Sequence, residues 1–103
     1  MRFLVKVRPK LERTNKSIAE GSFDERMQQI LSHIKPEAAY FFEEDGCRTA
    51  TFVVEIQRAS DIPNIGEPFF HGMEAEVRFH PVMSAQDLRE SNLQETAKQW
   101  SRS

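Results

Sequence analysis

The sequence feature that most constrains this fold is the dipeptide Asp45-Gly46, which separates two stretches rich in β-forming residues, 36–44 and 47–56. A two-residue type I′ turn requires positive φ at both central positions, and Asp-Gly is one of the pairs that adopt this conformation most readily. The sequence therefore predicts a β-hairpin centred on this dipeptide.

The two-residue loop also fixes the register of the hairpin. It pairs Glu44 with Cys47, Phe42 with Thr49, Tyr40 with Thr51, and Ala38 with Val53. One face then carries Ala39, Phe41, Ala50, Phe52 and Val54, and the other carries Ala38, Tyr40, Phe42, Thr49, Thr51, Val53 and Glu55. Because both faces hold apolar or aromatic side chains, we expect both to be covered.

The composition fits one globular domain with a single core. The chain has 103 residues, of which 39% are hydrophobic and 29% charged. The net charge of −2 and the dispersed basic residues argue against nucleic acid as the main partner. We expect no secretory signal and no membrane partner, because no apolar run is long enough for either. The single cysteine, Cys47, excludes an internal disulfide and predicts a cytoplasmic protein.

Two elements are predicted before the hairpin. Residues 2–8 alternate between apolar and charged side chains, which indicates a half-buried strand. We expect residues 9–16 to form a charged loop. Apolar residues then recur at helical spacing as far as Ile34 and predict a helix that begins at either Asn15 or Ser22, the second with a capping box.

Three elements are predicted after the hairpin. Ser60 is a suitable N-cap for a helix, which we expect Pro68 to kink or end early and Gly72 to stop. Residues 73–79 alternate and predict a strand. A last helix, opened by a capping box, is predicted from residue 84 to about residue 99.

The order strand, helix, strand, strand, helix, strand is that of a ferredoxin-like βαββαβ fold. Right-handed crossovers give an α+β protein with a four-stranded antiparallel sheet in the order 4-1-3-2 and two helices on one face. Residues 1–83 form the ferredoxin-like domain, and residues 84–103 form a C-terminal helical extension of the same domain. The expected core consists of Phe3, Val5, Val7, Phe41, Phe52, Val54, Ile56, Val77 and Phe79 in the sheet and Ile30, Leu31, Ile34, Ile65 and Phe69 in the helices.

The second face of the sheet, here called the open face, has no predicted helix to cover it. It presents Leu4, Lys6, Arg8, Ala38, Tyr40, Phe42, Thr49, Thr51, Val53, Glu55, Glu76, Arg78 and His80. Its apolar half favours a partner, and a second copy packed sheet to sheet gives a homodimer with two-fold symmetry. Two alternatives stay open. The C-terminal helix folds back as a lid anchored by Leu93 and Trp100, or the face stays in water.

Four motifs within residues 1–88 resemble a known group of proteins: KPEAAYF, EEDG-x-RTA, IP-x-I-x-EP-x-F and F-x-PVM. The chain resembles a small bacterial family of unknown function that has a ferredoxin-like fold and is related to the dimeric α/β-barrel proteins. The resemblance implies this fold and a homodimer. The wider dimeric α/β-barrel class includes cofactor-free monooxygenases, isomerases, haem-handling enzymes and ligand binders, so the fold selects no single activity.

The candidate site residues lie on the open face. Histidine side chains can accept and return a proton near neutral pH, so His80 is the candidate proton carrier. Tyr40 would donate a hydrogen bond, and Arg78 would stabilise a developing oxyanion. The candidate ligand-binding residues are Lys6, Glu55 and Phe42. In the simpler interpretation, the charged side chains form rim ion pairs and Tyr40 packs at the dimer seam.

Two functions fit the sequence. The first is a small-ligand binding or interaction module, which the absence of a specific catalytic motif favours. The alternative is a cofactor-independent monooxygenase or isomerase that acts on a small aromatic or enolic substrate. A closed pocket in which His80, Tyr40 and Arg78 converge would favour the enzyme. We expect no cofactor and no metal, because the possible ligands His71, Glu74, Glu76 and His80 lack metal-ligand spacing.

Overall fold

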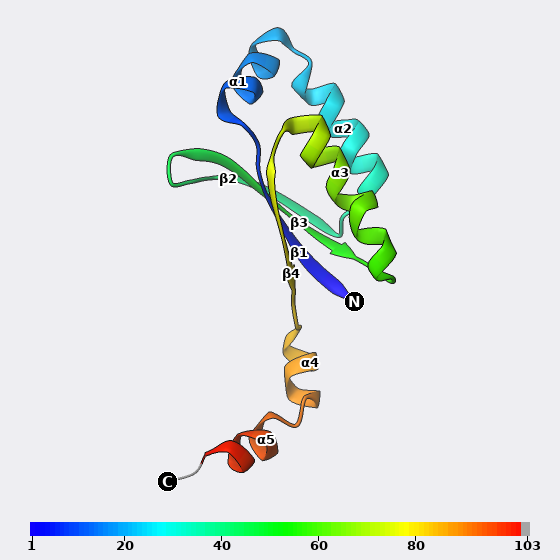
Figure 1. The fold of residues 1–103 in the computed structure, drawn as a ribbon, viewed down its shortest axis with the longest axis vertical. Coiled ribbons are helices and arrows are strands. Elements are labelled where there is room, and N and C mark those ends of the chain that lie inside the picture. The colour runs from blue at the N-terminus through cyan, green and yellow to red at the C-terminus, as the bar shows by residue number, and fades with distance from the viewer. Residues whose placement is uncertain (102–103) are drawn as a thin grey trace.

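The computed structural model describes residues 1–101, which form an α+β fold with a four-stranded antiparallel sheet, five α-helices and one short 3-10 helix (Figure 1). In chain order the elements are β1 (Arg2–Arg8), α1 (Leu11–Glu20), α2 (Phe23–Ile34), β2 (Ala38–Glu44), β3 (Cys47–Glu55), the 3-10 helix η1 (Ala59–Asp61), α3 (Ile62–Met73), β4 (Glu76–Pro81), α4 (Ala85–Glu90) and α5 (Leu93–Trp100). None of the helices in this range is long and apolar enough to cross a membrane.

The predicted hairpin is confirmed together with its register. β2 and β3 pair with Glu44 opposite Cys47, Phe42 opposite Thr49, Tyr40 opposite Thr51, and Ala38 opposite Val53. Asp45 and Gly46 have φ values of 54° and 76°, as a type I′ turn requires. β3 also pairs with β1, and β1 with β4, so the sheet order is β2-β3-β1-β4. Read from the other edge, this order is 4-1-3-2.

The core lies between the sheet and two helices, α2 and α3, which run side by side on one of its faces (Figure 1). Alternate side chains of β1 and β3 point toward the apolar sides of these helices. The buried hydrophobic residues are Val5, Val7, Met27, Ile30, Ile34, Ala50, Phe52, Val54, Ile56, Ile65, Phe69 and Met73. Phe41, which the sequence placed in this core, is 55% exposed instead.

The expected charged loop at residues 9–16 is wrong, because α1 begins at Leu11 and includes most of this segment. Its charged residues are good helix formers, and Pro9 lies just ahead of the helix, where a proline ring does not disturb it. The helix ends at Gly21, which adopts φ of 82° and donates its N–H to the carbonyl of Ile18. A left-handed residue therefore divides this region into two helices.

The helix after this break starts at the later of the two predicted positions. α2 begins at Phe23, directly after Ser22. The predicted capping box is not formed, because Ser22 has helical backbone angles and makes no side-chain cap. Its hydroxyl donates instead to the carbonyl of Ser17 in α1, at 3.3 Å. Ser22 thus stabilises the junction between the two helices.

Both ends of α3 differ from the prediction. Ser60 lies inside η1, and Asp61 takes the N-cap position of α3. Gly72 does not stop the helix, which ends where Glu74 adopts a left-handed conformation with φ of 48°. A non-glycine residue therefore provides the stop that the sequence assigned to glycine.

Pro68 lies inside α3 and does not end it, so the early end, one of the two expected effects of this proline, is wrong. Proline has no N–H, so the carbonyl of the residue four positions earlier, Asn64, loses its normal helical donor. Nε2 of His33 in α2 lies 3.0 Å from that carbonyl oxygen. A side chain from the neighbouring helix thus replaces the hydrogen bond that proline removes.

The C-terminal segment begins as predicted but does not form one helix. The capping box is present, because the N–H groups of Ser84 and Asp87 each donate to the side chain of the other, at 3.0 Å and 3.1 Å. Asn92, with φ of 60°, then separates α4 from α5. These two helices, here called the C-terminal arm, extend away from the sheet (Figure 1).

The arm gives the molecule an elongated shape. Its longest dimension is 60 Å, and its radius of gyration is 17.4 Å, against about 13 Å for a compact chain of similar length. Both residues that would anchor a lid, Leu93 and Trp100, are exposed. Within a single chain the arm therefore does not cover the open face.

We expect the substitution His33→Ala to lower the free energy of unfolding by about 1 kcal/mol, because it leaves the carbonyl of Asn64 without a donor. His71→Ala, at an exposed histidine of α3, is the control and should change this free energy by less than about 0.5 kcal/mol. Urea unfolding followed by circular dichroism measures both values. Equal effects of the two substitutions would contradict the role assigned to His33.

Candidate functional site

The candidate catalytic residues lie on the open face but at different edges of the sheet. The pairing register places Tyr40 of β2, Thr51 of β3, Lys6 of β1 and Arg78 of β4 in one row across the sheet. His80 lies in the next row of β4, opposite Leu4. Because neighbouring strands are about 4.8 Å apart, roughly 14 Å separates the backbones of Tyr40 and Arg78. One chain therefore brings Arg78 and His80 to the same edge and leaves Tyr40 at the other.

Two of the candidate ligand-binding residues, Lys6 and Glu55, already have partners. Lys6 and Arg8 both form salt bridges with Glu44, in which Nη2 of Arg8 lies 3.1 Å from Oε2 of Glu44. Oε1 of Glu55 lies 2.7 Å from the N-terminal ammonium group of Met1. The hollow beside this cluster, lined by Lys6, Arg8, Glu44, Glu76 and Arg78, measures about 20 Å³. It has room for about one water molecule and not for a substrate.

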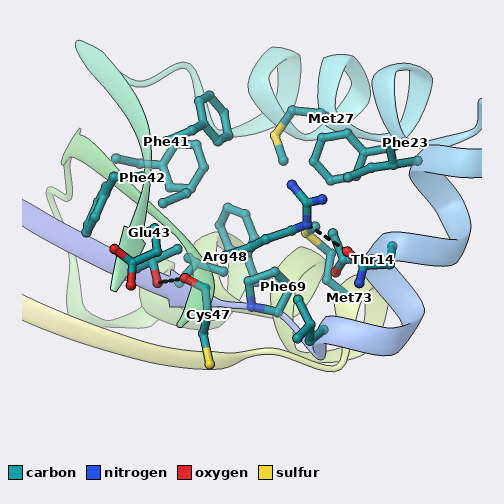
Figure 2. Close-up of a pocket in the computed structure, with 18 of the residues that line it drawn as sticks. Thr14, Phe23, Met27, Phe41, Phe42, Glu43, Cys47, Arg48, Phe69 and Met73 are labelled. Carbon is teal, nitrogen blue, oxygen red and sulfur yellow. Dashed lines mark hydrogen bonds between the residues drawn. The ribbon is translucent and has the colours of Figure 1, made fainter. Parts of the chain in front are cut away.

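A much larger cavity lies on the other side of the sheet, between α1, the start of α2 and the turn end of the hairpin (Figure 2). Its volume is about 610 Å³, and it is partly open to solvent. The apolar wall includes Ile18, Phe23, Met27, Phe41, Phe69 and Met73. A cavity of this size and lining has the dimensions of a site for a small organic molecule.

Phe41 forms part of this wall because the hairpin projects past α2 (Figure 1). Its ring meets Phe52 edge to face, with centroids 6.0 Å apart, and Phe52 stacks on Phe69 at 5.1 Å. The residue opposite Phe41 is Ala50, whose methyl group fills little space. The row of three aromatic rings therefore runs from Phe69 in the core to Phe41 in the cavity wall. The small side chain of Ala50 leaves open space beside the ring of Phe41.

Arg48 brings a positive charge into this wall. Figure 2 shows its side chain extending from β3 across the cavity toward α1. Its Nε donates to Oδ1 of Asn15 at 2.8 Å. Thr14, the preceding residue of α1, also lines the cavity and is only 4% exposed. The cavity thus combines an apolar wall with a small polar group at the α1 side.

The sequence prediction missed this cavity. Among the six candidate site residues, only Phe42 lines it. The usable signal lay in residues 11–18, where Leu11, Thr14 and Ile18 recur at helical spacing and continue the apolar pattern of α2 across Gly21. Because residues 9–16 were expected to form a loop, no helix was predicted on this side of the cavity.

Within residues 1–101, no three His, Cys, Asp or Glu side chains gather closely enough to hold a metal ion. The possible ligands named from the sequence are used elsewhere or lie apart. Glu74 pairs with Arg13, at 2.8 Å, and His71 lies 2.8 Å from Glu67.

No protein family and no curated protein sequence matches this chain. Among solved structures, it is similar to a de novo designed protein, Ferredog-Diesel. That match covers 79% of this chain and 85% of the designed one, with 15% sequence identity and a TM-score of 0.46.

We expect Glu44 to contribute to the loss of stability in acid. Its pKa is lowered in the folded protein, chiefly by the hydrogen bond from Lys6 and also by the charges of Lys6 and Arg8. A carboxylate whose pKa falls on folding stabilises the protein above its unfolded pKa, and this contribution disappears as the pH falls through the folded pKa.

The substitution Glu44→Gln should therefore make the free energy of unfolding fall less steeply between about pH 5 and pH 3 than in the wild type. Urea unfolding at a series of pH values measures this slope. Glu12→Gln, at an exposed position of α1, is the control and should keep the wild-type slope. An unchanged slope in Glu44→Gln would show that this ion pair is not formed in solution.

Proposed function

We propose that the protein is a small-ligand binding module and that its ligand occupies the cavity between α1, α2 and the hairpin. The observation that carries this proposal is the apolar cavity of about 610 Å³, which lies within the usual size range of ligand sites. Because the cavity is partly open, its apolar wall lies in contact with water, which is unfavourable in proportion to the exposed apolar area. A bound apolar molecule would remove this area from water.

The exposure of Phe41 supports the same proposal. An aromatic side chain buries a large apolar area when it is covered, at about 25 cal/mol for each Å². In the free chain Phe41 is more than half exposed, although it adjoins the core ring Phe52. A ligand in the cavity would cover Phe41 and extend the stack that begins at Phe69.

The second part of the proposal is a homodimer formed through the open face, with the ferredoxin-like topology and the dimeric α/β-barrel arrangement that the sequence motifs imply. Tyr40 and Phe42 are exposed there, and the row formed by Ala38, Val53 and Leu4 carries an apolar strip across three strands. A second copy would cover these side chains, as expected for a sheet with apolar groups on both faces. It would leave most of the cavity accessible, because the cavity opens on the helix side and Phe42 is the one exposed open-face phenylalanine among the described residues of its wall.

The alternative function, a cofactor-independent monooxygenase or isomerase, rests on His80, Tyr40 and Arg78 acting together. None of these three residues lines the large cavity, and the small hollow beside Arg78 is too small for a substrate. The geometry of one chain therefore favours the binding module.

Ligand binding can be tested with N-phenyl-1-naphthylamine, a neutral apolar dye that becomes fluorescent in dry pockets. We expect saturable binding to the full-length protein and a loss of at least about tenfold in affinity for Ile18→Trp, which would fill the cavity mouth. Leu88→Trp is the matched control, because Leu88 is as exposed as Ile18, at 45% against 40%, and lies on the C-terminal arm. Absence of saturable dye binding to the wild type would contradict the proposed function.

The homodimer predicts a mass near twice the chain mass of 12.0 kDa in light scattering at micromolar concentration. Tyr40→Glu should shift the protein to the monomer, because it places a charge in the proposed interface. Phe70→Glu, at an exposed phenylalanine on the helix side, is the control and should leave the mass unchanged. A monomeric wild type would contradict this part of the proposal.

A further inference from the structure

Arg48 has no carboxylate within salt-bridge distance in the part of the chain that the structure describes. The hairpin register places it directly opposite Glu43, where a cross-strand ion pair is normal. Oε2 of Glu43 accepts a hydrogen bond from the N–H of Gly46 at 2.7 Å, which holds that carboxylate at the turn. The guanidinium of Arg48 is therefore free of its natural partner.

A single hydrogen bond fixes where this guanidinium lies. Nε donates to Oδ1 of Asn15, so the side chain bridges the hairpin and α1 across the cavity (Figure 2). The bond uses one of the five N–H groups of the guanidinium, and it leaves the two terminal amino groups to bind a carboxylate side by side. Thr14 adds a hydroxyl group to the same wall.

We propose that the ligand of this cavity is a monocarboxylic acid with an apolar body, whose carboxylate binds the terminal amino groups of Arg48. This inference rests on the proposed function, because it names the class of ligand for the same cavity. The apolar body would lie against Phe23, Met27 and Phe41, and the carboxylate would lie at the α1 side, near solvent. An amphiphilic acid matches the division of the wall into an apolar part and one cation.

The charged residues around the cavity favour a ligand with one negative charge over a ligand with two. Arg48 is the one cationic residue among the described residues of the wall, and Glu43 contributes an acidic group nearby. A phosphate monoester carries close to two negative charges at neutral pH. The second charge would have no cation to pair with and would be repelled by the carboxylate of Glu43. A carboxylate is balanced by Arg48 alone.

The test measures displacement of N-phenyl-1-naphthylamine from the full-length protein by nonanoate, 1-octanol and octyl phosphate, which share one octyl chain. We expect Arg48→Gln to weaken nonanoate binding about tenfold and to leave 1-octanol binding unchanged, because only the acid gains a charge-assisted hydrogen bond. Arg48→Lys should bind nonanoate with an affinity between those of the wild type and Arg48→Gln, since it keeps the charge and loses the paired geometry. Octyl phosphate should bind no more tightly than nonanoate.

Arg89→Gln, at an exposed arginine of α4, is the control for a general change of charge and should leave all three ligands unaffected. Dye binding to Arg48→Gln reports separately that this variant is folded with its cavity intact. If the dye binds but Arg48→Gln binds nonanoate as tightly as the wild type does, the carboxylate inference is wrong and the binding function stands. If octyl phosphate binds more tightly than nonanoate, the choice of a single charge is wrong. If the wild type does not bind the dye, the proposed function itself fails.

Discussion

The two-residue turn at Asp45-Gly46 is the constraint on which most of this structure depends. Because a loop of this length allows one register, it decides which side chains of β3 meet the helices. Phe52 enters the core, and Arg48, four residues earlier on the same side of the strand, reaches the cavity. A slip of one residue would exchange the faces, bury Val53 under the helices and point Arg48 to the other side. The turn thus sets both the core and the chemistry of the candidate site.

The cavity results from a mismatch in length between the hairpin and the helices that cover it. α2 and α3 cover the sheet tightly around Phe52, but the turn end of the hairpin extends beyond them (Figure 1). α1 closes this end only in part, because Gly21 turns the chain before α2 begins. Phe52 belongs to both regions, since it stacks on Phe69 and meets Phe41. Occupation of the cavity would therefore stabilise the folded state through the core itself.

The strands could be predicted from the sequence, because strand alternation and turn chemistry are local properties, and their order followed from the right-handedness of the crossovers. The fate of Pro68 could not, since the group that compensates for it, His33, is 31 residues away in sequence from the carbonyl it meets. The distances between the candidate site residues could not be predicted for a related reason. Strand alternation correctly places His80 and Tyr40 on the same face of the sheet. It does not give the distance between them, and here they lie on the two edge strands of a four-stranded sheet. The cavity depends on the length of the hairpin relative to the helices that pack on it. The periodicity of one segment of sequence gives no information about how far another segment extends.

The position of Trp100 decides what the intrinsic fluorescence of this protein reports. It is the single tryptophan of the chain, and it lies on α5 with 82% of its surface exposed. Melting of the sheet would leave the surroundings of this indole almost unchanged, so its emission carries little information about the core. Contact of the arm with any other surface would shift that emission toward the blue. The fluorescence of Trp100 therefore reports contacts of the C-terminal arm and not unfolding of the core.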